Sequence, residues 1–114
     1  MKIKTSELIG PALDWAVGKA EGLTPTLHKN PYGYWVMPNL PGSYSTDWSQ
    51  GGPIIERERI TVSSRHDGWW RAWLYTIDDE PHTYVIGPTP LISAMRCLVF
   101  SKLGDEVEIP EELK

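Results

Sequence analysis

The segment Thr89–Leu103 constrains the fold more than any other part of this chain, because its apolar residues cover nearly the whole circumference of a helix. Those residues are Leu91, Ile92, Ala94, Met95, Leu98, Val99 and Leu103. Thr89 can cap the first turn with its hydroxyl, Pro90 suits the first helical position, and Gly104 can end the helix. A helix that is apolar all round is buried. We therefore expect a C-terminal helix inside the core.

A second helix is predicted near the N-terminus. Gly10-Pro11 places a proline in its first turn, and Leu13, Ala16, Val17 and Ala20 follow at helical spacing. Four later segments have the composition of strands: Tyr32–Met37, Ile60–Ser63, Trp69–Thr76 and Thr83–Ile86, with turns at Arg65–Gly68 and Asp78–Pro81. The expected fold is α+β, a small antiparallel sheet of three to five strands packed against the N-terminal helix and the buried C-terminal helix.

The segment Pro53–Glu58 fits two patterns. It can be a short helix with Pro53 at its first position, or a strand with Ile54, Glu56, Glu58 and Ile60 on one face. We favour the helical turn. With 114 residues, the chain is expected to form one domain, residues 1–114. Its acidic residues 104–114 should form an extended tail, which Val107, Ile109 and Leu113 can tether.

The net charge of −4 resides in this tail. Residues 1–103 carry ten acids and ten bases, whereas residues 104–114 carry five acids and one base. Because uncompensated Lys and Arg do not cluster, we expect no direct binding of nucleic acid. No apolar run approaches the roughly 18 residues of a membrane helix, so we expect no membrane contact. The single Cys97, and the lack of an apolar signal segment after Met1–Lys4, predict a cytoplasmic protein.

A polar loop, Pro38–Pro53, contains the most suggestive group of residues. Within it, Ser45–Gly52 combines hydroxyls, a carboxylate, an amide, an indole and two glycines, which together can hydrogen-bond and stack on a small molecule. A helix starting at Pro53 would point free N–H groups at the same loop. The candidate ligand-binding residues are Ser45, Thr46, Asp47, Trp48, Gln50, Gly51, Gly52, Arg57, Thr89 and Arg96. The alternative is that Ser45, Thr46 and Asp47 are turn and capping residues.

Signatures of catalysis and of metal binding are mostly missing. His28, His66 and His82 are scattered without the spacing of metal ligands, and Cys97 lies on the apolar helix as a core thiol. A glycine-rich phosphate motif does not occur. An acid–base pair could be formed from Asp47, Glu56 and Glu58, the carboxylates that cluster outside the tail. We nevertheless expect no catalytic residue, no metal and no cofactor.

Four stretches resemble a known family. They are KTSEL (Lys4–Leu8), ALDWAV (Ala12–Val17), STDWSQGGPIIERE (Ser45–Glu58) and GPTPLISAMRCLVFSKLGDEVEIPEEL (Gly87–Leu113), and they are similar to the NinX-like family of small proteins from lambdoid and other tailed phages, whose function is unknown. The resemblance covers more than half of the chain. It implies a phage product acting in the cytoplasm of the infected bacterium, and it brings no catalytic residues with it. Arg59 departs from the glycine expected there, which argues against a sharp helix end.

These observations predict a non-enzymatic binding protein. The leading hypothesis is a homo-oligomer that captures a small polar or nucleotide-like ligand and so sequesters a host defence signal. In it, Trp48 stacks, Asp47 and Gln50 read hydrogen-bonding edges, and Arg57 or Arg96 meets negative charge. The alternative is an effector that binds a host or phage protein through an aromatic surface or through the acidic tail.

Overall fold

The structure is a computed structural model that describes residues 1–40, 42–74 and 84–113. In chain order its elements are β1 (Lys2–Lys4), the 3₁₀ helix η1 (Thr5–Glu7), α1 (Gly10–Ala20), β2 (His28–Lys29), β3 (Trp35–Val36), α2 (Trp48–Glu58), β4 (Thr61–Ser64), β5 (Trp70–Trp73), β6 (Tyr84–Gly87), α3 (Pro90–Leu103), β7 (Glu106–Glu108) and the 3₁₀ helix η2 (Glu111–Leu113). The α+β fold expected from the sequence is confirmed.

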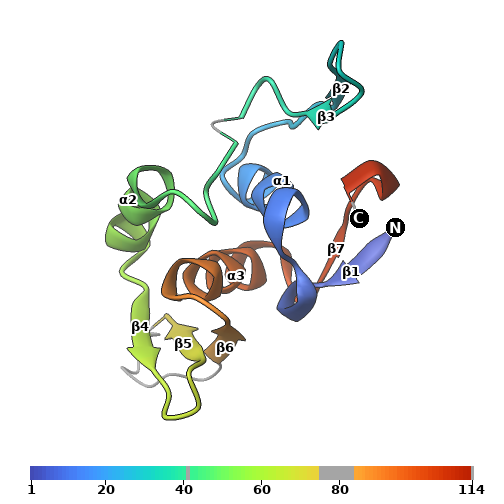
Figure 1. The fold of residues 1–114 in the computed structure, drawn as a ribbon. Coiled ribbons are helices and arrows are strands. Elements are labelled where there is room, and N and C mark those ends of the chain that lie inside the picture. The colour runs from blue at the N-terminus through green and yellow to red at the C-terminus, as the bar shows by residue number, and fades with distance from the viewer. Residues whose placement is uncertain (41, 75–83, 114) are drawn as a thin grey trace.

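The helix α3 is the centre of the molecule, as predicted. Ala94, Met95, Leu98 and Val99 are completely buried. The helix contacts all three strands β4, β5 and β6 on one side and α1 and α2 on others (Figure 1). Its ends also follow the sequence: the Thr89 hydroxyl accepts a hydrogen bond from the Ile92 N–H at 3.1 Å, and the helix ends before Gly104.

The strands form three small antiparallel sheets. The main sheet has the order β4-β5-β6, and Val62, Ala72 and Val85 are aligned across it. These three side chains pack on the hydrophobic core. At the end of β6, a Cβ on Gly87 would lie 2.6 Å from the Ser93 nitrogen, so the glycine allows β6 to approach α3 closely. The predicted turn Asp78–Pro81 lies outside the described residues.

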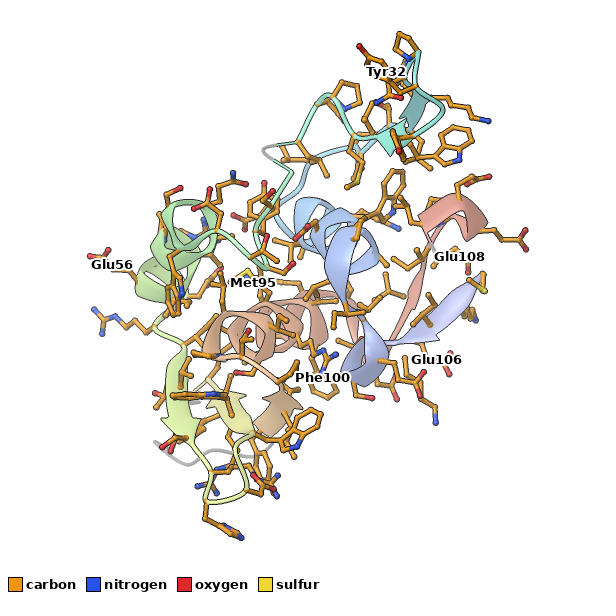
Figure 2. All side chains as sticks on the ribbon, in the orientation of Figure 1. Tyr32, Glu56, Met95, Phe100, Glu106 and Glu108 are labelled. Atoms are coloured by element: carbon orange, nitrogen blue, oxygen red, sulfur yellow. The ribbon has the colours of Figure 1, made fainter. Side chains whose placement is uncertain are left out.

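The predicted strand Tyr32–Met37 is shorter than expected. Only Trp35–Val36 is a strand, paired with His28–Lys29 as a β2–β3 hairpin. The reason is a turn around Asn30, whose side-chain oxygen accepts hydrogen bonds from the N–H groups of Tyr32 and Tyr34. Figure 1 shows this hairpin standing away from the rest of the protein, and Tyr32 lies at its tip in Figure 2. Residues 24–40 are hereafter called the arm.

The prediction that a helix begins at Pro53 is wrong. The helix α2 begins five residues earlier, at Trp48, because Asp47 caps it: the Asp47 carboxylate accepts a hydrogen bond from the Ser49 N–H at 2.9 Å. Pro53 lies inside the helix, where no free N–H groups are available. The expected anion site at a Pro53 helix start therefore does not exist.

The expectation that α2 has no sharp end is also wrong. Arg59 adopts a left-handed conformation, with φ 55° and ψ 45°. The N–H of Ile60 then donates to the Ile55 carbonyl at 3.0 Å, and the N–H of Arg59 to the Glu56 carbonyl at 3.3 Å. This pair of hydrogen bonds is a Schellman motif, which usually has glycine at the left-handed position. Arg59 accepts the conformation that the expected glycine would adopt more easily.

The acidic tail returns to the N-terminus. β7 pairs with β1, which places Val107 opposite Ile3. Val107 and Ile109 are buried in the core, and the tail ends in the 3₁₀ helix η2. The Thr5 hydroxyl donates to the Gly104 carbonyl at 2.6 Å, and the Thr5 N–H donates to the Asp105 carbonyl at 2.8 Å. The two ends of the chain are thus held together beside α3.

Candidate functional site

The predicted polar loop lies beside the start of α3. Ser45, Thr46, Trp48 and Thr89 line one small depression of about 230 Å³, together with Leu91 and Ile92. The packing beneath it depends on a glycine, because a Cβ on Gly51 would lie 2.4 Å from the Tyr44 carbonyl oxygen and 2.6 Å from Leu91 Cδ1. The structure therefore brings these predicted residues together, but in a space below the roughly 300 Å³ of ordinary ligand pockets.

Two predicted residues, Asp47 and Gln50, do not line this depression and instead stabilise the start of α2. The Asp47 carboxylate accepts hydrogen bonds from the Ser49 N–H and hydroxyl, and from the Gln50 amide at 3.2 Å. The Gln50 oxygen in turn accepts from the Ser43 N–H at 2.9 Å. The hydrogen bonds from Ser49 lower the pKa of Asp47. Asp47 and Gln50 therefore act as capping residues here, the alternative that the sequence left open for Asp47.

Ser45 is held from behind by a buried carboxylate. Its N–H donates to Asp14 Oδ1 at 2.9 Å, and burial raises the pKa of Asp14 while the hydrogen bonding of Ser45 opposes that rise. The Ser45 hydroxyl is buried and makes no hydrogen bond of standard geometry, although it lies near the same carboxylate. We attribute the fixed position of Ser45 to the N–H contact, whose geometry is well formed. Asp14 was not among the predicted site residues.

The two predicted arginines lie elsewhere. Arg57 forms a bidentate ion pair with Glu21, with distances of 2.9 and 2.5 Å, so it joins α2 to the end of α1. Gly52 also stays outside the depression: a Cβ there would meet only the Trp48 ring, at 3.8 Å. Arg96 lies in a different pocket. The ten predicted residues therefore do not form a single site.

The pocket that contains Arg96 is larger, about 550 Å³. It lies beside β6, η1 and the β1–β7 ribbon, and it is hereafter called the Arg96 pocket. Its lining residues are Lys4, Thr5, Ser6, Trp69, Tyr84, Val85, Ile86, Arg96, Phe100, Asp105 and Glu106. Phe100 on α3 and Glu106 on β7 are labelled in Figure 2. This volume lies within the range of pockets for small molecules.

Arg96 is a buried cation that forms no ion pair with any residue that the structure describes. Its side chain comes from α3 and is only 6% exposed. Nε donates to the Leu8 carbonyl at 2.8 Å and Nη1 donates to the Ile86 carbonyl at 2.9 Å, so both engaged groups have neutral partners. Across residues 1–40, 42–74 and 84–113, no ion pair includes Arg96. Burial lowers the pKa of Arg96, but an arginine keeps its charge in proteins.

Aromatic side chains line the same pocket. Trp69 and Tyr84 are about half exposed, with 46% and 51% of their surfaces accessible, and Phe100 is partly buried. The Arg71 guanidinium lies 5.7 Å from the centre of the Tyr84 ring, which holds that ring by a cation–π contact. A planar ligand can stack on such rings while its charged group reaches Arg96.

Sequence reasoning identified one residue of this pocket, Arg96, and missed the others. Trp69 was recognised as a strand residue and as part of an aromatic surface for a protein partner, and Tyr84 only as a strand residue. Lys4 and Phe100 were given no role in binding. Trp69 lies near the open end of the β5–β6 hairpin and Tyr84 lies next to its connection, so no single local pattern marks both residues. Nothing in the sequence indicates that the N-terminal strand lies beside this hairpin.

Within the described ranges, no three His, Cys, Asp or Glu side chains come close enough to hold a metal ion. None of the helices in that same part of the chain has both the length and the apolar character needed to cross a bilayer.

Comparison with known proteins identifies the family. No curated protein matches the sequence. The family model described as bacteriophage P22, NinX matches residues 4–102. The match includes α1, α2, all of α3 except Leu103, and the residues of the Arg96 pocket from Lys4 to Phe100. Because it spans most of the 114 residues, the chain belongs to the bacteriophage P22 NinX family.

Proposed function

We propose that this phage protein binds a small polar, nucleotide-like ligand in the Arg96 pocket, without chemical reaction, in the cytoplasm of the infected host. The ligand carries an anionic group and a planar ring. Such binding would sequester a small molecule, for example a host defence signal. The observation that carries the proposal is the buried guanidinium of Arg96, whose hydrogen-bond partners among the described residues are neutral carbonyls, in a pocket lined by aromatic residues.

The energetics of Arg96 favour an anion. A buried charge without a counter-charge is costly, and hydrogen bonds to two carbonyls offset only part of that cost. A carboxylate or phosphate that enters the pocket supplies the missing charge and forms charge-assisted hydrogen bonds with the remaining N–H groups. The rings of Trp69 and Tyr84 add apolar contact at low entropic cost. Anion and ring are therefore recognised by different sides of one pocket.

The test is a binding experiment with nucleosides and nucleoside monophosphates. Titration calorimetry, together with quenching of the tryptophan fluorescence, should show that AMP binds more tightly than adenosine. A ligand present at 100 times its Kd should stabilise the protein by about 2.7 kcal/mol. Arg96→Gln should abolish the preference for AMP, because glutamine is neutral. If neither AMP nor any other nucleoside monophosphate binds, the proposal is wrong.

Two variants locate the site. Tyr84→Leu should weaken binding of AMP, since it removes a ring from the Arg96 pocket. Trp48→Leu is the matched control, because Trp48 is an aromatic residue of similar exposure, 54%, in the other depression. Equal effects of the two substitutions would place the ligand outside the Arg96 pocket.

A second candidate function is that of an effector that binds a protein. It is favoured by the exposed aromatic residues of the arm: Tyr32 is 84% and Tyr34 69% exposed, and Trp35 lies beside them. Tyr and Trp are the residues that dominate protein interfaces. The arm would bind either a host protein or a second copy of this chain. Binding of a second copy would give the expected homo-oligomer. The double substitution Tyr32→Ser and Tyr34→Ser should then abolish capture of a stoichiometric partner, or self-association measured by sedimentation.

A further inference from the structure

We infer that the ligand of the Arg96 pocket is dipolar: it carries one anionic group, which meets Arg96, and an amino group, which meets Asp105 and Glu106. This inference rests on the proposed function and specifies the class of ligand. Small aromatic zwitterions, with a ring, one carboxylate and one ammonium, fit this description best. Polyphosphates do not fit it.

The lining of the pocket carries charges of both signs. Among the described residues, two basic ones, Lys4 and Arg96, and two acidic ones, Asp105 and Glu106, line the pocket, so their formal charges cancel. Lys4 and Glu106 are opposite each other in the β1–β7 register. Even so, no ion pair within 4.0 Å joins any of these four side chains in the described part of the chain. Charges of both signs are therefore available to a ligand.

The Arg96 guanidinium is held more than 4.0 Å from the carboxylates of Asp105 and Glu106. Arg96 is fixed by the carbonyls of Leu8 and Ile86, so its guanidinium cannot turn toward the acids without losing both hydrogen bonds. The backbone on the acidic side is fixed as well, because the buried Thr5 hydrogen-bonds the carbonyls of Gly104 and Asp105. The fixed guanidinium on one side, and the exposed carboxylates of Asp105 and Glu106 on the other, create a field across the pocket.

This field determines which ligands the pocket accepts. An anion alone gains from Arg96 but is repelled by the two carboxylates, and this repulsion grows with each additional phosphate. A ligand with an anion at one end and an amine at the other satisfies both sides. Its ring then lies between them, where Trp69, Tyr84 and Phe100 line the pocket. The pocket therefore discriminates against nucleoside triphosphates.

The test compares ligands that share a ring. Calorimetry with the full chain should give phenylalanine the lowest Kd, about fivefold or more below those of 3-phenylpropanoate, which lacks the amine, and of phenethylamine, which lacks the carboxylate. In parallel, AMP should bind more tightly than ATP. If 3-phenylpropanoate binds as tightly as phenylalanine, or ATP more tightly than AMP, the dipolar ligand is excluded while anion binding, and with it the proposed function, stands. If no compound binds, both proposals fail.

A matched pair of double variants assigns the amine to the acidic side. Asp105→Asn with Glu106→Gln should remove the advantage of phenylalanine over 3-phenylpropanoate and strengthen the binding of ATP. The control, Glu111→Gln with Glu112→Gln, removes the same number of charges from a part of the tail outside this pocket, so the preference should persist. Unchanged melting temperatures would show that both variants are folded. If the two double variants behave alike, the effect is one of net charge, and the inference is wrong.

Discussion

Two adjacent glycines in α2 have different roles, and substitution can separate them. A Cβ on Gly51 would lie 2.4 Å from a backbone oxygen of Tyr44, which cannot move without shifting the loop. We expect Gly51→Ala to lower the free energy of unfolding by about 2 kcal/mol, as other overpacked sites do. The midpoint of urea denaturation measures this change.

Gly52→Ala is the matched control in the next position of the same helix. Its Cβ would lie 3.8 Å from the Trp48 ring, which is ordinary van der Waals contact. Because alanine favours the helix over glycine, this variant should be as stable as the parent protein or up to about 1 kcal/mol more stable. The close approach of α2 to α3 would be disproved if Gly51→Ala matched Gly52→Ala in stability.

Asp14 should make stability depend on pH. Burial raises the pKa of Asp14 above 3.8, so the native protein binds this proton more tightly than the unfolded chain. As the pH rises above 3.8, the unfolded chain loses the proton first, and stability falls until the pH passes the folded pKa. Asp14→Asn cannot ionise, yet its side-chain oxygen can still accept the Ser45 N–H.

The free energy of unfolding of Asp14→Asn, relative to that of the parent protein, should therefore increase from pH 3 upward and then level off. Urea denaturation of both proteins at several pH values measures it, and carboxylates common to both cancel in the difference. A difference that stays constant with pH would mean that Asp14 titrates alike in both states. One that decreases with pH would mean that its hydrogen bonds outweigh its burial.

At the scale of elements, α3 could be predicted almost residue by residue, whereas the start of α2 could not. The ends of α3 are marked by Thr89, Pro90 and Gly104, and the spacing of its apolar residues fits a buried helix alone. In α2, Gly51, Gly52 and Pro53 are all poor helix formers and suggest a loop. Tertiary packing overrides this tendency. One pattern in the sequence did indicate the observed start of α2: the capping residue Asp47 is followed three positions later by the amide residue Gln50.

The end of α2 offers a second prediction at this scale. Arg59 occupies a left-handed conformation that costs a residue with a side chain about 1 kcal/mol, whereas glycine adopts it freely. Arg59→Gly should therefore raise the free energy of unfolding by up to about 1 kcal/mol. Arg57→Gly, inside the last turn of the helix, should lower it, since it lacks that conformational benefit and removes the ion pair with Glu21. If neither Arg59→Gly nor Arg57→Gly raises the free energy of unfolding, α2 does not end in a Schellman motif.

At the scale of the whole molecule, the candidate site could not be predicted because it depends on long-range pairing. The Arg96 pocket is formed by residues from Lys4 to Glu106, which β1 and β7 bring together across almost the whole chain. Local patterns predict helices, strands and caps, because these depend on neighbouring residues. They do not indicate which edge of a hairpin lies against the N-terminus. Sequence reasoning consequently identified Arg96 as a candidate but associated it with the wrong loop.

The reactivity of Cys97 reports whether the elements from both ends of the chain stay packed around α3 in the native protein. Cys97 is the single cysteine, it is buried within α3, and burial raises its pKa to about 11. At pH 8 about one thiol in a thousand is ionised, and a thiol reagent cannot reach it without opening of the core. Because α3 contacts the main sheet, α1, α2 and η1, we expect that opening to be global unfolding. Native Cys97 should thus react at least about a thousandfold more slowly than the unfolded protein does.

The measurement is the rate of modification by a chromogenic disulfide reagent, in increasing concentrations of urea. The logarithm of that rate should rise with urea as steeply as global unfolding does. Ser101→Cys supplies the control, because residue 101 is exposed on the same helix and its thiol should react at once. If Cys97 in the native protein reacts as fast as Cys at position 101, α3 is accessible without unfolding. The N- and C-terminal elements would then not close over the core as a unit.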